Sequence, residues 1–150
     1  MDRKTKIIAT IGPATLDAPL FEKLIGEGVN YIRINSAYGD YKQYDQILEN
    51  FNKYGLPNGV KVIYDIRDHS KLDYFLKNKL DMVAVSFVNN AEQVGTVKEK
   101  TNGAFVIAKI ETAEGVNNID SIIDASDGVI IARGDLAEAE TIERVPVLQK

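Results

Sequence analysis

Short apolar runs alternate with amphipathic segments along the whole chain. Six runs rich in β-branched residues recur: KIIAT (6–10), YIRIN (31–35), KVIYD (61–65), MVAVSF (82–87), FVIAKI (105–110) and GVIIA (128–132). Each run is nearly continuous in apolar residues, which is typical of parallel strands covered on both faces. The pattern therefore predicts six buried strands.

Segments with helical spacing separate these runs. In APLFEKLIGEGV (18–29), Leu20, Leu24 and Ile25 fall on one helix face, and the late glycines are typical of a helix stop. The later connectors are YKQYDQILENFNKY (41–54), KLDYFLKN (71–78), AEQVGTVKEK (91–100) and VNNIDSIIDA (116–125). Five βα pairs and a sixth strand predict an α/β fold with a parallel sheet and right-handed crossovers. This sheet is either open and doubly wound or part of a (β/α)₈ barrel, for which six strands are two too few.

Composition narrows the class of protein. The 150 residues suit a single domain spanning 1–150, and 45% hydrophobic with 27% charged residues is ordinary for a soluble globular chain. A net charge of -4 argues against binding to nucleic acids or anionic membranes. The chain has no cysteine, which excludes disulfides and thiolate catalysis. Because no apolar run approaches the length of a membrane span, we expect a soluble cytoplasmic protein.

Polar residues follow every predicted strand, where parallel βα folds bind their ligands. They are Thr10, Arg33, Asn35, Asp65, Arg67, Ser86, Lys109, Glu111, Arg133 and Asp135. Any one of them alone is more simply explained as a loop charge or a local salt bridge. Their coincidence at six strand ends indicates a functional site.

Lys109 and Glu111 are two residues apart on a predicted strand, so their side chains point to the same face. Asp135 follows the neighbouring strand, at a spacing of about 4.8 Å between strands. Two carboxylates suit Mg²⁺ or Mn²⁺, which prefer oxygen ligands. An ion pair between Lys109 and Glu111 is the structural alternative. Gly134 would let backbone amides approach a substrate carboxylate, and a short helix is expected to start after Asp135.

Several of these motifs resemble the pyruvate kinase family. They are TKIIATIGPAT (5–15), YIRINSAYG (31–39), VAVSFV (83–88), IAKIETAEGV (107–116) and SDGVIIARGDLAEAE (126–140). The resemblance extends over nearly the whole chain, and the last two motifs are long and specific. It implies a (β/α)₈ barrel catalytic domain, here an incomplete one with about six strands, and phosphoryl transfer between phosphoenolpyruvate and ADP.

The resemblance also implies roles for individual residues. Glu111 and Asp135 match the family's divalent-metal ligands for Mg²⁺ or Mn²⁺, and Lys109 matches its lysine at the transferring phosphoryl group. Arg33 matches an arginine near the phosphate. The family's ligands for a monovalent cation, K⁺, match Asn35 and Asp65, and its backbone site for the substrate carboxylate matches Gly134 and Asp135.

The chain departs from the family pattern in three places. The family's NFSHG motif reads NSAYG here, so that a serine ligand of the monovalent cation becomes Ala37 and K⁺ binding is doubtful. The chain passes from Asp65 directly towards the next helix, without the family's inserted lid domain, and Arg67 stands at a lysine position of the family motif. The last two barrel strands and the C-terminal domain have no counterpart. Without a lid that excludes water, phosphoryl transfer is expected to be slow.

Three functions remain open on the sequence. The first is pyruvate-kinase-type phosphotransfer, with phosphoenolpyruvate or pyruvate and ADP or ATP as partners. The second is a metal-dependent enolpyruvate lyase or decarboxylase that needs no nucleotide, and the third is a non-catalytic barrel fragment. Six strands of a barrel also leave two exposed edges, so we expect a homo-oligomer.

Overall fold

The computed structural model describes residues 4–150, and its chain divides into two compact units. The first unit is Met1–Asp65 and the second is Ile66–Lys150. No helix among the described residues is long and apolar enough to cross a membrane.

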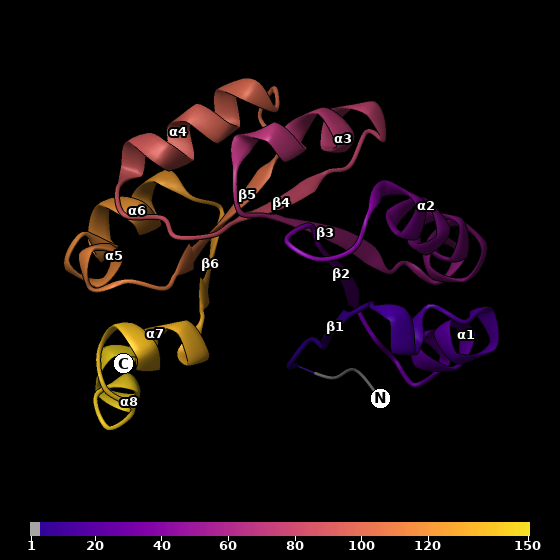
Figure 1. The fold of residues 1–150 in the computed structure, drawn as a ribbon, viewed down its shortest axis with the longest axis horizontal. Coiled ribbons are helices and arrows are strands. Elements are labelled where there is room, and N and C mark those ends of the chain that lie inside the picture. The colour runs from indigo at the N-terminus through magenta and orange to yellow at the C-terminus, as the bar shows by residue number, and fades with distance from the viewer. Residues whose placement is uncertain (1–3) are drawn as a thin grey trace. The chain divides into compact units, whose positions relative to one another are not determined.

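Six strands, all in parallel pairs, alternate with helices in the described residues (Figure 1). They are β1 (Ile8–Thr10), β2 (Tyr31–Asn35), β3 (Lys61–Ile66), β4 (Met82–Val85), β5 (Phe105–Ile110) and β6 (Gly128–Ile131). In the first unit β1 pairs with β2 and β2 with β3, and in the second unit β4 pairs with β5 and β5 with β6. The prediction of a parallel βα repeat with about six strands is confirmed.

The strands differ in how far they are covered. Strand β4 and most of β3 and β5 are buried, as expected for strands between two layers. Strand β2 instead alternates, because Ile32 and Ile34 are buried while Tyr31, Arg33 and Asn35 are only half-buried. Strands β1 and β6 are largely half-buried or exposed. The prediction that all six strands are covered on both faces was therefore wrong for these three.

Eight α-helices occur in the described residues. They are α1 (Ala18–Gly26), α2 (Tyr41–Asn50), α3 (Leu72–Lys77), α4 (Ala91–Lys100), α5 (Ala113–Asn117), α6 (Ile119–Ala125), α7 (Arg133–Ala139) and α8 (Val145–Leu148). Short turns complete the structure: the 3-10 helices η1 (Pro13–Thr15), η3 (Leu56–Asn58) and η4 (His69–Lys71), and the π-helical turn η2 (Phe51–Gly55).

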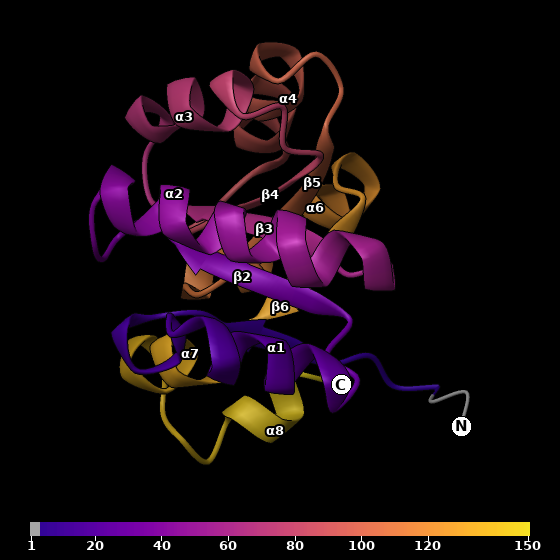
Figure 2. The ribbon, with the colours of Figure 1, turned by 90° about the vertical axis from the view of Figure 1, so that its right-hand side faces the viewer.

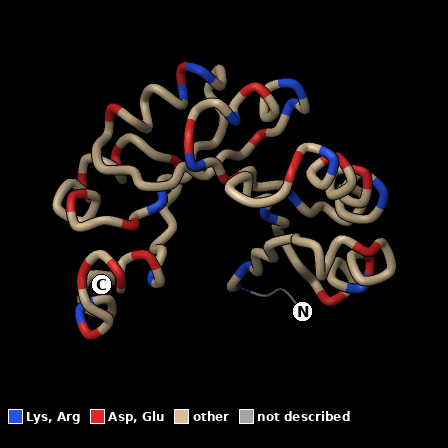
Figure 3. The backbone as a smooth tube through the Cα atoms, viewed as in Figure 1, with Lys and Arg blue, Asp and Glu red and all other residues tan. Residues whose placement is uncertain are grey.

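Each unit places its core between helices and strands. In the first unit α1 and α2 lie side by side along the strands (Figure 2) and bury apolar residues such as Phe21 and Ile47. In the second unit α4 packs against α6 and β5 through Val94 and Val97, and α6 contributes Ile122. Along the helices of each unit, Lys and Arg positions are interspersed with Asp and Glu positions (Figure 3).

Three helix boundaries differ from those predicted. The helix expected over 41–54 ends as α2 at Asn50 and continues as the π-helical turn η2, where buried Gly55 lies against Phe51. The connector expected over 116–125 consists of two helices, α5 and α6, because Asn118 leaves the helical conformation between them. The helix expected after Asp135 is observed as α7 and begins at Arg133, so that Asp135 lies in its first turn.

Candidate functional site

Lys109 and Glu111 meet at the carboxyl end of β5. Their side chains point to the same face, as the strand parity predicts, and Lys109 Nζ lies 2.9 Å from Glu111 Oε1. Both residues are buried, with 8% and 3% of their surfaces exposed. The structure therefore contains the ion pair that was the alternative to a metal site.

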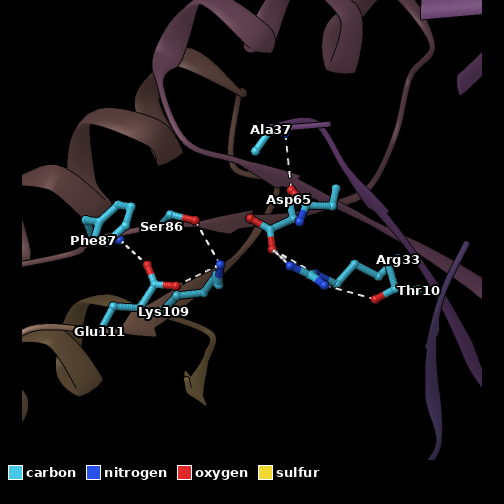
Figure 4. Close-up of polar contacts among 9 residues, drawn as sticks. Thr10, Arg33, Ala37, Asp65, Ser86, Phe87, Lys109 and Glu111 are labelled. Carbon is cyan, nitrogen blue, oxygen red and sulfur yellow. Dashed lines mark hydrogen bonds and ion pairs between the residues drawn. The ribbon is translucent and has the colours of Figure 1, made fainter. Parts of the chain in front are cut away.

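Two groups from the end of β4 hold this pair (Figure 4). Ser86 Oγ accepts a hydrogen bond of 2.8 Å from Lys109 Nζ. The backbone N–H of Phe87 donates a hydrogen bond of 2.6 Å to Glu111 Oε2. Each carboxylate oxygen of Glu111 is thus engaged by one donor, so the side chain is fixed at both ends.

Burying these two charged side chains costs free energy, so stability alone does not explain why the ion pair is there. Removing two charges from water costs several kcal/mol per ion, and the attraction between the charges offsets about the same amount. A pair of well-packed apolar residues would often make the protein more stable. Fixed charges in a water-poor site are, however, well suited to stabilise charge that develops on a substrate. The arrangement is therefore preorganised for chemistry on an anionic group.

Phe87 has a backbone conformation that bulky residues rarely adopt. Its φ is 55°, in the left-handed region, which costs a non-glycine residue on the order of 1 kcal/mol. The guanidinium of Arg67 stacks over the Phe87 ring, 5.3 Å from its centroid. Arg67, which stands at a lysine position of the family motif, therefore lies on this ring.

The first unit contains a second polar cluster, also drawn in Figure 4. Arg33 Nε donates a hydrogen bond of 2.7 Å to Asp65 Oδ2, and Arg33 Nη2 lies 2.6 Å from the same oxygen. Arg33 Nη1 also donates to Thr10 Oγ1 at 2.9 Å. Because the Asp65 side chain is only 1% exposed, Arg33 is the cation that balances its buried charge.

These contacts do not suit a monovalent cation at Asn35 and Asp65. Arg33 already places two nitrogens on Asp65 Oδ2, and Asn35 Oδ1 accepts the backbone N–H of Ala37 at 3.1 Å. The side chain of Ala37 brings no oxygen. Since a bound cation would have to compete with Arg33 for Asp65, we derive no role for K⁺.

Arg133, Gly134 and Asp135 form the first turn of α7, and all three are exposed. A pocket of about 680 Å³ adjoins this turn. It is lined by Arg133, Gly134, Ala137, Ile142, Val145, Pro146, Gln149 and Lys150. Among residues 4–150 no group of three or more histidine or acidic side chains is placed to hold a metal ion.

The donor set of the second unit nevertheless fits a hard divalent cation. An ionised carboxylate offers about four acceptor positions, and the contacts of Lys109 and Phe87 use two of those on Glu111. Asp135 supplies an exposed carboxylate. Mg²⁺ commonly binds through one or two protein carboxylates and completes its shell with water and substrate oxygens. Two carboxylates are therefore sufficient for such an ion.

Sequence reasoning identified Arg33, Asn35, Asp65, Lys109, Glu111, Gly134 and Asp135 as candidate site residues. The structure joins Lys109 to Glu111 and Arg33 to Asp65. It also reveals the Phe87 amide as a partner of Glu111, which sequence reasoning missed. No pattern of residue types signals this contact, because it depends on a left-handed backbone at a non-glycine residue.

Comparison with known proteins gives matches within one family. The family model described as "Pyruvate kinase, barrel domain" matches residues 2–62 and 59–150. A pyruvate kinase of Geobacillus stearothermophilus is 34% identical over 153 aligned positions, which cover 97% of this chain and 24% of the relative. The pyruvate kinases of Trypanoplasma borreli and Clostridium acetobutylicum are 46% and 40% identical over 85 and 89 residues, in each case 56% of this chain.

The chain spans only part of these relatives, between 17% and 24% of their length. The matched family model nevertheless covers residues 2–150 in two overlapping segments. The chain therefore belongs to the pyruvate kinase family, within that family's barrel domain.

Proposed function

We propose that the chain carries a metal-dependent site for phosphoenolpyruvate or pyruvate and supports phosphoryl transfer between phosphoenolpyruvate and ADP. The observation that carries this proposal is the buried Lys109–Glu111 pair, fixed by Ser86 and the Phe87 amide. Membership of the pyruvate kinase family supports the same chemistry.

Lys109 is the proposed catalytic cation of the second unit. Its ammonium is held by Glu111 Oε1 and Ser86 Oγ, so two of its three N–H groups are oriented. Its positive charge is proposed to face the phosphoryl or enolate oxygens of the substrate and to stabilise the negative charge that develops there. Arg33 is proposed to neutralise phosphoryl oxygens, and the backbone of Gly134 and Asp135 to bind the substrate carboxylate.

A divalent cation, Mg²⁺ or Mn²⁺, would be held by Glu111 and Asp135, and when bound it would stabilise the enolate oxygen as a Lewis acid. The two contacts of Glu111 orient its carboxylate for this task before the ion arrives. Such support of a metal-ligating carboxylate by hydrogen bonds is common in metal sites.

A second function is favoured by the connection after β3. The chain enters η4 directly after Asp68, and the two segments matched by the family model overlap, at 2–62 and 59–150. We propose that residues 1–150 form one partial barrel domain without an inserted lid. Without a lid, nucleotide-dependent transfer is slowed by water, whereas a metal-dependent lyase or decarboxylase of enolpyruvate needs neither lid nor nucleotide.

Proton exchange tests the chemistry that both functions share. The protein is incubated with pyruvate and Mn²⁺ in D₂O, and the loss of methyl protons is followed by NMR. Each exchange breaks one C–H bond and forms one C–D bond from solvent, so no oxidant or reductant is required. We expect exchange in the wild type and a loss of at least roughly a hundredfold in Lys109→Met, since a preorganised charge at the reacting group contributes about that much.

A coupled assay then separates the two functions. Phosphoenolpyruvate and ADP are supplied with Mg²⁺, and pyruvate and ATP are measured together. Formation of both products identifies a kinase, and exchange without ATP formation identifies a lyase-type site. Absence of exchange at millimolar pyruvate and Mn²⁺ would contradict both functions and leave the non-catalytic barrel fragment.

A further inference from the structure

The turn after β4 is strained and yet strongly fixed. Phe87 has a φ of 55° and directs its N–H at Glu111 Oε2 over 2.6 Å. Strained backbone of this kind persists only where surrounding contacts determine it, and it is common at active sites. Contacts with other segments must therefore hold residues 86–89 in this conformation.

Hydrogen bonds tie this turn to β5 and to the start of α5. The Val88 N–H donates to the Lys109 carbonyl at 3.3 Å. Thr112 Oγ1 donates to Asn89 Oδ1 at 2.5 Å, and it accepts the Gly115 N–H at 3.0 Å as the cap of α5. One threonine hydroxyl thus joins the turn to the helix that follows Glu111.

Gly115 makes the closest approach between the two segments. A Cβ atom built on Gly115 would lie 2.6 Å from the backbone carbonyl oxygen of Val88, a distance that real Cβ atoms essentially never show. Gly115 is buried within α5, and its φ is not in the left-handed region. Glycine is therefore required there by the neighbouring carbonyl and not by its own backbone conformation.

We propose that Gly115 and Thr112 are positioning residues for Glu111. They hold the Val88 carbonyl and Asn89 against α5, and this fixes the turn whose Phe87 amide orients the Glu111 carboxylate. We call these contacts of Thr112 and Gly115 with Asn89 and Val88 the latch. The effect of the latch on catalysis rests on the proposed function, whereas the existence of these contacts does not. A larger residue at position 115 would push the Val88 carbonyl away and withdraw the Phe87 amide from Glu111.

The amide proton of Phe87 reports this contact directly. The chain has five phenylalanines, so labelling with ¹⁵N-phenylalanine gives five backbone signals, and Phe87→Leu identifies the one in question. A short bond to a carboxylate shifts an amide proton downfield and protects it from exchange with solvent. In Gly115→Ala we expect an upfield shift and protection reduced by roughly tenfold or more, as for loss of a charged hydrogen bond.

Gly95→Ala is the matched control. Gly95 is also an interior helix glycine, in α4, but a Cβ built there meets no atom within 4 Å. Both substitutions favour the helix by propensity alone. Gly95→Ala should therefore raise the melting temperature and leave the Phe87 signal unchanged.

Thr112→Ser and Thr112→Val extend the test if Gly115→Ala does not fold. Serine keeps the hydroxyl that bonds Asn89 and Gly115, while valine keeps the shape and removes both bonds. We expect the Phe87 signal to remain downfield in Thr112→Ser and to move upfield in Thr112→Val. An unchanged Phe87 signal in Thr112→Val, or in a folded Gly115→Ala, would overturn the proposal.

Pyruvate proton exchange separates this proposal from the proposed function. If the wild type exchanges methyl protons, Gly115→Ala should lower the rate while Gly95→Ala does not. If the wild type shows no exchange, the proposed function fails, and the Phe87 signal still decides whether the latch exists. Undiminished exchange in a folded Gly115→Ala variant would overturn the positioning role.

Discussion

At the scale of single residues, Arg33 brings a positive charge to the buried Asp65 carboxylate. Its carboxylate is almost fully buried and receives two nitrogens of Arg33, whose own side chain is 23% exposed. Removing one member of such a pair leaves an uncompensated charge in a water-poor site. Arg33 therefore has a structural role, as the ion-pair partner of buried Asp65, in addition to its proposed contact with phosphate.

Replacing Arg33 with methionine should destabilise the protein strongly. Methionine keeps the apolar stem but leaves Asp65 without this cation, at a cost of about 3 kcal/mol in the free energy of unfolding. Urea denaturation followed by circular dichroism measures this change. Lys98→Met is the control, because Lys98 pairs with Asp127 near the surface at 3.0 Å and such pairs contribute less than about 1 kcal/mol. Equal losses in both variants would contradict the assigned role of Arg33.

How much of the site could be predicted differs from residue to residue. Lys109 and Glu111 are two positions apart on one strand, and strand parity alone brings their side chains to one face. The pairing of Arg33 with Asp65 could not be predicted, because it depends on a register that sets Asn35 beside Asp65 on neighbouring strands. The Phe87 amide could not be predicted either, since a left-handed backbone at phenylalanine has no signature in residue type.

At the scale of elements, Asp127 connects the start of β6 to β5 and α4. Its Oδ2 accepts the Val106 N–H of β5 at 2.8 Å, and its Oδ1 accepts from Lys98 Nζ of α4 at 3.0 Å. The hydrogen bond from the Val106 amide has the largest effect and lowers the pKa of the Asp127 carboxyl; burial opposes it, and the hydrogen bond and charge of Lys98 lower the pKa further. The ionised form therefore holds three elements together.

The stability of the protein should fall as the Asp127 carboxyl is protonated. Because its pKa is lower in the folded state, its contribution is present above the ordinary aspartate pKa of about 3.9 and is lost as the pH falls below that value. Asp127→Asn should unfold more readily at neutral pH and lose part of the wild type's pH dependence below about pH 4. The melting temperature measured between pH 2.5 and pH 7 tests this prediction. If the melting temperature of the variant falls at acidic pH as steeply as that of the wild type, the prediction is wrong.

The predicted elements agree best where the apolar pattern is long. The helix predicted over 18–29 is observed as α1, and that over 91–100 as α4. The connector over 116–125 was misjudged because Asn118, which interrupts the helix, bonds the distant Asn89 carbonyl at 2.8 Å. Such a contact between segments is not visible in the local spacing of apolar residues.

At the scale of the whole molecule, two strands have one neighbour each. Among the described residues β1 pairs only with β2, and β6 pairs only with β5. Strand edges of this kind offer unpaired backbone groups, and Ile8 and Val129 on them are 47% and 38% exposed. We propose that a second copy of the chain covers them in a homo-oligomer.

Sedimentation velocity tests the oligomeric state. At micromolar concentration we expect a species of at least twice the 16.6 kDa mass of the chain. Ile8→Lys and Val129→Lys place charges on the two edges and should shift the equilibrium towards monomers. A wild-type protein that sediments as a monomer would contradict the proposal.

We propose that Glu111 belongs to a site for a divalent cation and an enolpyruvate substrate. Titration of the protein with Mn²⁺ in the presence of pyruvate, followed by calorimetry, tests it most directly. We predict saturable binding of one ion per chain in the wild type and a loss of roughly tenfold or more in affinity in Glu111→Gln, because the neutral amide is a poorer ligand for a hard cation. Absence of binding in the wild type, or equal binding by both proteins, would contradict the claim.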